Sequence, residues 1–128
     1  MKKIVVLLLL MVSANVFAEW TPVGVNSDMT VYADSGTIKK KGNKVKMWSL
    51  NDLKTVKKIA NDRYWSIASH QENDCEEETT RILDLYFYSG NMRQGDVVYS
   101  NRNIKDEPES IIPGSTSEAL FEIACGKK

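Results

Sequence analysis

The sequence predicts an α+β domain in which one C-terminal helix packs on an antiparallel sheet. Three observations support this class: strand-type runs separated by turn signals, a well-capped helix at the end, and a length that suits one hydrophobic core. The chain has 128 residues and shows no internal repeat, linker or low-complexity segment. We therefore expect one folded domain over residues 19–128.

Residues 1–18 have the layout of a bacterial secretory signal peptide. Two lysines precede an unbroken apolar run from Ile4 to Val12, and VFA precedes the expected cleavage between Ala18 and Glu19. The run is shorter than the about 20 residues that cross a bilayer, which argues against a transmembrane anchor. No cysteine follows the cleavage site, so we expect no lipid anchor. The sequence thus predicts export by Sec to the periplasm or the medium.

The first half of the sheet is predicted from short strand-type runs. WTPVGV at residues 20–25 is followed by TVYAD at 30–34, and then by turn signals at Gly36 and Gly42-Asn43. Residues 44–50 alternate, with Val45, Met47 and Ser49 on one face and Lys46, Trp48 and Leu50 on the other. Alternation of this kind is typical of a sheet with one packed face and one wetter face.

The second half of the sheet is predicted from longer strand-type runs. Residues 63–71 and 81–89 are rich in aromatic and β-branched residues, and SGNMRQG at 89–95 reads as a hairpin leading into 96–101. Residues 51–62 are ambiguous, because their apolar residues have the spacing of one helical face: Leu53, Val56, Ile59 and Ala60. We predict a loop there that includes at most one helical turn.

The C-terminal helix carries the strongest local signals. Ser115 and Glu118 form a Ser-x-x-Glu capping box, and Gly126 suits the position just after the last turn. Lys127 and Lys128 suit the negative end of the helix dipole. The predicted apolar face consists of Leu120, Ile123 and Ala124, with Phe121 and Cys125 adjoining it.

The two cysteines, Cys75 and Cys125, are interpreted as a structural disulfide. An even cysteine count in a small exported domain favours this pairing, which would join the end of a strand to the helix. A metal site is the first alternative, but His70 is the only histidine that could assist. A free reactive thiol is the second, although the three glutamates after Cys75 would raise its pKa.

Catalytic chemistry is not indicated. His70 lacks a serine or cysteine nucleophile at a suitable spacing, and no nucleophile elbow or phosphate-binding glycine loop occurs. The carboxylates of residues 72–78 and 106–109 are interpreted as solvated loops rather than a calcium site. We therefore expect no enzyme activity and no cofactor. Without residues 1–18 the chain has 15 basic and 17 acidic residues, and this near-neutral charge argues against nucleic acid as the main partner.

Two surface features could serve binding. Five lysines crowd one predicted hairpin and could contact a sulfated glycan, anionic lipid headgroups or an acidic protein: Lys39, Lys40, Lys41, Lys44 and Lys46. The alternative is a hairpin that lysines protect from edge-to-edge pairing. Tyr86, Tyr88 and Tyr99 are predicted to share one sheet face, either covered by the helix or open to a ligand. An exposed sheet edge is also compatible with a homodimer.

The order of motifs resembles the surface-adhesin protein E family. The matching segments are VYAD, GTIKKKGNKVKMWSLND, SIASHQENDC, YSGNMRQGDVVYS, IIPGS and LFEIAC, which span Trp20 to Cys125. The resemblance implies a single antiparallel sheet of about six strands, a C-terminal helix and a disulfide. Several motif residues are interpreted as mostly structural: Tyr32, Trp48, Cys75, Arg81, Gly95, Pro113 and Cys125.

The same resemblance implies a role at the cell surface. Family membership implies binding of host matrix or plasma proteins such as vitronectin and laminin in cell adhesion. The alternative function is a soluble periplasmic inhibitor or envelope-maintenance protein with no adhesive role. Pro108 and Glu109 stand where relatives often have a tryptophan before the PGS motif.

Overall fold

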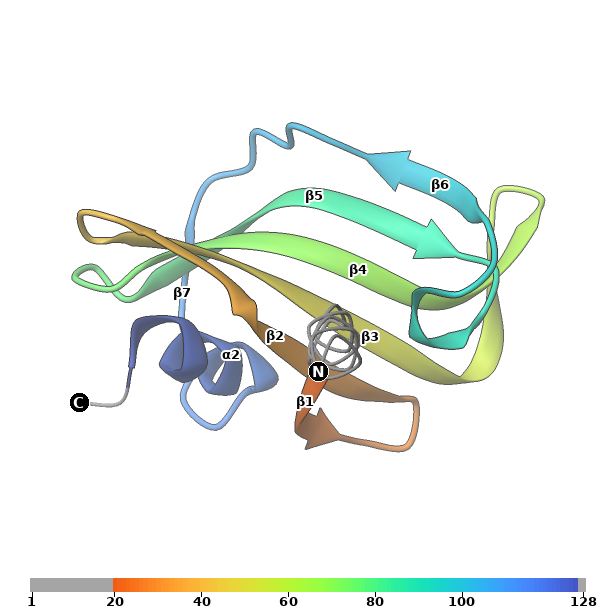
Figure 1. Ribbon diagram of the computed structural model, residues 1–128, viewed down its shortest axis with the longest axis horizontal. Helices are drawn as coiled ribbons and strands as arrows, with labels where there is room; N and C mark the ends of the chain where they lie inside the picture. The colour runs from red at the N-terminus through yellow and green to blue at the C-terminus, as the bar shows by residue number, and fades with distance from the viewer. Residues whose placement is uncertain (1–19, 127–128) are drawn as a thin grey trace, which may run out of the picture.

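The computed structural model describes residues 20–126, which form one antiparallel sheet and a C-terminal helix (Figure 1). The main strands are β1 (Trp20–Val25), β2 (Met29–Lys41), β3 (Lys44–Ile59), β4 (Asp62–Asp74), β5 (Thr79–Tyr88) and β6 (Val97–Asn101). They lie side by side in chain order, and the two-residue strand β7 (Glu109–Ser110) pairs with β5. The predicted fold class is confirmed. The predicted signal peptide, its cleavage site Ala18–Glu19, Lys127 and Lys128 lie outside the described residues.

The segment predicted as a loop, residues 51–62, is instead the end of one long hairpin. β3 continues to Ile59 and pairs with β4 around a turn at residues 60–61, so the loop prediction is wrong. The helical spacing has no counterpart in packing, because Leu53 is only 3% exposed whereas Val56 is 40% exposed. Pairing with β2 and β4 decides the conformation of this segment rather than its local pattern.

Helix α2 (Thr116–Cys125) covers the sheet face on which Val45 and Met47 of β3 lie. Val31 and Ala33 of β2 and Val45 and Met47 of β3 pack with the helix residues Leu120 and Ala124 in one buried cluster. Because α2 contacts β1, β2 and β3 most, the core lies under the first half of the sheet. The predicted apolar face of the helix is therefore correct in its main residues.

The helix is capped as predicted, with one difference. The Ser115 hydroxyl accepts the backbone N–H of Glu118 at 3.2 Å, while the Glu118 carboxylate accepts the N–H of Gly114 at 3.1 Å rather than that of Ser115. At the other end, the Gly126 N–H donates to the carbonyl of Glu122, and its φ of 87° suits glycine. Both helix ends thus have partners for exposed backbone groups.

A disulfide joins Cys75 and Cys125, with their Cα atoms 5.6 Å apart. Cys75 lies in the turn after β4, and Cys125 is the last residue of α2. The bond therefore attaches the end of the helix to the β4–β5 hairpin. The prediction of a structural disulfide is confirmed.

Candidate binding surfaces

All five lysines of the predicted patch are exposed, at the tip of the β2–β3 hairpin. Lys39 pairs with Lys46 and Lys41 pairs with Lys44, so strand alternation places these four on one face. Lys40 pairs with the buried Val45 and lies on the face that the helix covers. The four lysines of the first group are called the lysine row below.

Acidic groups adjoin the lysine row without matching it in number. Glu72 is the cross-strand partner of Lys46, and its carboxylate lies 3.8 Å from the ammonium group of Lys44. The same carboxylate oxygen accepts the Arg81 Nε–H at 3.0 Å. Because like charges directly opposite each other destabilise a strand pair, the two lysine pairs are a local cost, which Glu72 and Asp74, the cross-strand partner of Lys44, only partly offset.

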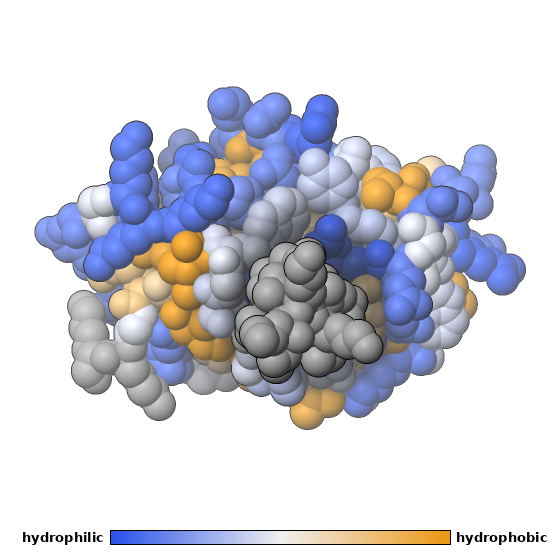
Figure 2. Space-filling model, viewed as in Figure 1, coloured by the Kyte–Doolittle hydropathy of each residue, from blue (hydrophilic) through white to orange (hydrophobic). Residues whose placement is uncertain are grey.

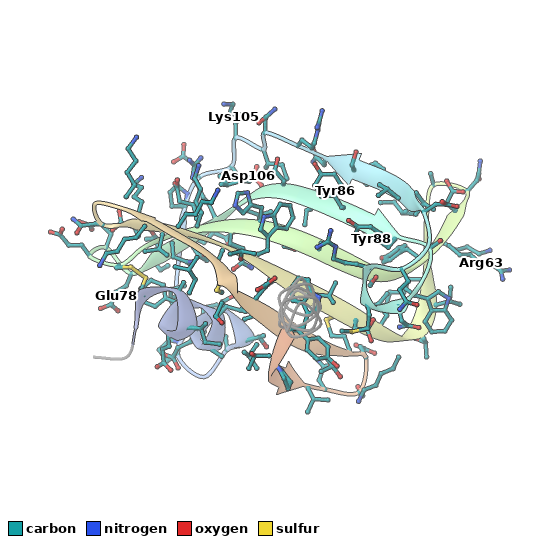
Figure 3. The ribbon with its side chains drawn as sticks, viewed as in Figure 1. Arg63, Glu78, Tyr86, Tyr88, Lys105 and Asp106 are labelled. Atoms are coloured by element: carbon teal, nitrogen blue, oxygen red, sulfur yellow. A yellow bond between two sulfur atoms is a disulfide. The ribbon has the colours of Figure 1, made fainter. Side chains whose placement is uncertain are left out.

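A second basic surface, which sequence reasoning missed, lies at the opposite end of the sheet. The outer part of the β3–β4 hairpin exposes Lys54, Lys57, Lys58 and Arg63. In an antiparallel sheet the β2–β3 and β3–β4 turns lie at opposite ends, and Figure 3 labels Arg63 at the right, away from the β2–β3 turn at the left. Figure 2 shows hydrophilic side chains projecting at both ends of the long axis. The segment was missed because its lysines were attributed to a loop.

The three tyrosines predicted to share one face do not do so. Tyr86 and Tyr88 lie on one face of β5, whereas Tyr99 pairs with Phe87 and contacts that ring edge-on at 5.3 Å. Tyr99 therefore belongs to the opposite face, because neighbouring residues of a strand alternate. The prediction is wrong for Tyr99 because it had no register between β5 and β6 to follow.

An open pocket of about 390 Å³ lies on the sheet face opposite the helix. Its lining residues come from three strands and the β5–β6 loop: Asp34, Thr37, Trp48, Tyr86, Tyr88 and Arg93. The Trp48 ring stacks on the His70 ring with their centroids 4.6 Å apart, and its centroid lies 5.9 Å from that of the Tyr86 ring. Figure 3 labels Tyr86 and Tyr88, which follow one another along β5 on this face. We call this the aromatic pocket.

One wall of the aromatic pocket is an irregular part of β2. Pairing between β2 and β3 shifts between Asp34 and Lys39, and there the Thr37 hydroxyl accepts the Trp48 N–H at 2.9 Å. The Asp34 carboxylate accepts the Gly36 N–H at 3.1 Å, and a side chain at Gly36 would approach that carboxylate at 3.2 Å. The bulge thus replaces ladder hydrogen bonds with side-chain bonds beside Trp48.

The opposite wall is the β5–β6 loop, whose 3-10 turn η1 (Asn91–Arg93) folds back onto β3 and β4. The Met92 N–H donates to the Asp52 carboxylate at 2.7 Å, and the Arg93 N–H donates to the Ser66 hydroxyl at 3.0 Å. Gly95 closes the loop with a φ of +79°, and an added Cβ would lie 2.2 Å from the Ser89 hydroxyl. The loop is therefore held in one conformation over the pocket.

His70 is not free at the surface. Its Nδ1 lies 3.1 Å from the Asp84 carboxylate, and both side chains are 21% exposed. Partial burial alone raises the pKa of Asp84, but hydrogen bonds from the Asn103 N–H and from His70, together with the charges of His70 and Arg102, outweigh it. The pKa of Asp84 is consequently lowered from its ordinary value of 3.8.

The pair of His70 and Asp84 makes the free energy of unfolding depend on pH in the acidic range. A carboxyl whose folded-state pKa is lowered stabilises the fold above its unfolded pKa, and that contribution is lost as the pH falls through the folded value. We expect the stability difference between the wild type and Asp84→Asn to shrink as the pH falls from about 5 to about 2. Urea denaturation across this range measures it, with the exposed Asp62→Asn as the matched control. A difference that stays constant with pH would contradict the assignment.

Within residues 20–126, no group of three or more histidine, cysteine, aspartate or glutamate side chains is placed to hold a metal ion. Over the same residues, no helix is long and apolar enough to cross a membrane.

The fold and its free face define a small single-sheet α+β domain with a basic hairpin and an aromatic pocket on one side. A family model described as surface-adhesin protein E matches residues 20–126. The chain therefore belongs to the surface-adhesin protein E family. The comparison with curated proteins finds no match.

Solved structures of Haemophilus influenzae protein E have the same fold. Crystal form II is similar with a TM-score of 0.60 at 17% identity, covering 85% of this chain and 95% of that one. A second structure of Haemophilus influenzae protein E has a TM-score of 0.59 at 17% identity, covering 85% of this chain and 92% of that one. The structure of protein E from non-typeable Haemophilus influenzae has a TM-score of 0.56 at 17% identity, covering 85% of this chain and 82% of that one. At this identity the likeness establishes the fold, including the sheet that carries the lysine row.

Proposed function

We propose that this chain is a non-enzymatic adhesin of the bacterial envelope, which is exported by Sec and binds an acidic macromolecular partner through the lysine row. The observation that carries the proposal is the cross-strand pairing of Lys39 with Lys46 and of Lys41 with Lys44 on one face. Membership of the adhesin family supports the adhesive role. Host matrix and plasma proteins such as vitronectin and laminin, or sulfated glycans, are the proposed partners.

The position of the hairpin also fits protection of an edge. β1 pairs with residues 30–34 of β2, so residues 39–41 have a strand neighbour only in β3. Lysines on such an unpaired edge hinder pairing with a second chain. Protection alone needs few charges, however, and does not require two directly opposed lysine pairs on one face. The surplus of positive charge supports a binding role in addition.

Charge reversal of three lysines of the lysine row is expected to weaken binding to a polyanion. The variant Lys39→Glu, Lys41→Glu, Lys46→Glu should bind immobilised heparin at least about tenfold more weakly at physiological salt, because surface attraction is lost. Wild-type binding should also fall as salt is raised. Binding of the purified protein to heparin, vitronectin and laminin is measured by surface plasmon resonance.

The chain provides a matched control at the other end of the sheet. The variant Lys54→Glu, Lys57→Glu, Lys58→Glu changes the same charge on exposed strand positions of the second basic surface. It should keep the wild-type affinity. If the control loses binding and the lysine-row variant does not, the partner binds at the β3–β4 hairpin and the proposal is wrong.

Location separates adhesion from a purely periplasmic role. An adhesin has to be exposed on intact cells, so protease added outside should remove the protein. Release only by osmotic shock, with full protection from external protease, would favour the periplasmic inhibitor or envelope-maintenance function instead.

A further inference from the structure

The aromatic pocket is lined by one cationic side chain, that of Arg93, which has no carboxylate partner among residues 20–126. The Arg93 guanidinium lies 5.6 Å above the centre of the Tyr88 ring. Within the described part of the chain it forms no ion pair; the three ion pairs found there involve Lys44, His70 and Arg81. An arginine presents its donors as a planar fork that matches a carboxylate, so this guanidinium is suited to an anionic group of a ligand.

The backbone that presents Arg93 is strained. Met92 and Arg93 both have left-handed φ values, 54° and 63°, in a turn where neither residue is glycine. Such conformations cost free energy and persist where neighbouring contacts enforce them. Here Asp52 accepts both the Met92 N–H and the Asn91 side-chain amide, and Ser66 accepts the Arg93 N–H. The hydrogen bonds therefore fix the backbone from which the Arg93 side chain projects before any ligand arrives.

The remaining lining fits a sugar ring. Trp48 and Tyr86 provide aromatic surface against which the C–H face of a pyranose can pack. Asp34, only 5% exposed, adds a carboxylate that accepts hydrogen bonds from hydroxyl groups. A wholly apolar ligand would strip water from the exposed guanidinium of Arg93 without replacing its hydrogen bonds, which is unfavourable. The volume of about 390 Å³ lies within the range of small-molecule sites.

From these contacts we infer that the aromatic pocket binds an acidic pyranose, a sialic or uronic acid residue of a glycan. Its carboxylate pairs with Arg93, its C–H face packs on Trp48 and Tyr86, and its hydroxyls donate to Asp34. This site is independent of the lysine row and does not need the proposed adhesive function. Because Lys46 and Trp48 project from the same face of β3, a longer acidic glycan bound here can continue onto the lysine row.

NMR titration of the ¹⁵N-labelled protein tests the inference. The probes are the methyl glycosides of N-acetylneuraminic acid and glucuronic acid, with methyl glucoside as the neutral probe. We expect an acidic glycoside to shift the Trp48 indole N–H signal, assigned with Trp48→Phe, and the Arg93 amide signal. The glycoside with the lower Kd identifies the type of acidic sugar. The neutral glucoside should bind at least about tenfold more weakly, because it lacks the carboxylate.

Variants separate the role of Arg93 from general charge. Arg93→Gln should weaken binding of the acidic glycoside at least about tenfold, and Arg93→Lys should weaken it less, because it keeps the charge but loses the fork. Arg63→Gln is the matched control on the distant hairpin and should bind like the wild type. The lysine-row variant should keep monosaccharide binding while losing heparin, which distinguishes the two sites.

Asp52 tests the positioning of the loop. Asp52→Ala should weaken glycoside binding although Asp52 does not line the pocket, and Asp52→Asn should restore part of it by keeping an acceptor oxygen. Amide spectra confirm that each variant is folded. The inference is overturned if no acidic glycoside shifts the pocket signals of the folded wild type, or if the neutral glucoside and Arg93→Gln bind as well as the acidic sugar and the wild type.

Discussion

Replacing Cys75 and Cys125 by alanine is expected to lower the free energy of unfolding by about 4 kcal/mol. The disulfide closes a loop with a sequence separation of 50 residues, and a cross-link of this span removes that much chain entropy from the unfolded state. The C-terminal helix should be affected most directly, because its last residue is one end of the bond. Urea denaturation of the double variant and the oxidised wild type measures the change.

The reduced wild type is the control for this comparison. It lacks the same cross-link but keeps both sulfur atoms, so its stability should lie close to that of the double variant. Amide hydrogen exchange should be faster in α2 than in β3 and β4 when the bond is absent. A loss below about 1 kcal/mol would show that the unfolded chain is not constrained as the entropy model requires.

Met47→Ala is expected to destabilise the domain by about 3 kcal/mol. Met47 is fully buried between the sheet and α2, in the cluster that includes Leu120 and Ala124. Truncating a buried methionine removes apolar contacts and leaves a cavity, which costs about 2–5 kcal/mol. Thermal and urea denaturation measure the loss.

Val56→Ala on the same strand is the matched control. Val56 is 40% exposed on the protruding β3–β4 hairpin, so its truncation should change stability by less than about 0.5 kcal/mol. Equal effects at the two positions would mean that the helix does not bury Met47 as described.

Local patterns predicted the parts of the fold that local chemistry controls. The capping serine and the final glycine predicted the bounds of α2, and the alternation of residues 44–50 predicted which side chains of β3 share a face. The two cysteines predicted the disulfide because no other pairing existed. The loop prediction for residues 51–62 was wrong because their conformation depends on pairing with other strands, at residues that include Met29 and Tyr64.

The candidate surfaces show the same limit. The lysines are close in sequence, so their clustering was visible before the structure, although the opposite orientation of Lys40 needed the strand register. The aromatic pocket joins Asp34, Trp48 and Arg93 from three separate segments, and no spacing rule links them. Strand alternation already placed Trp48 on the face of Lys46, which was the one local signal for that surface.

The disulfide between Cys75 and Cys125 also sets how the domain responds to mechanical load. A pull applied to the two ends of the chain passes through the sulfur–sulfur bond and bypasses the residues between the cysteines. Those residues include β5, β6 and most of α2, and their extended length of roughly 170 Å cannot be released while the bond holds. Under tension, only β1 to β4 can unravel, so Tyr86, Tyr88 and Arg93 stay within a covalently closed loop that the load does not stretch.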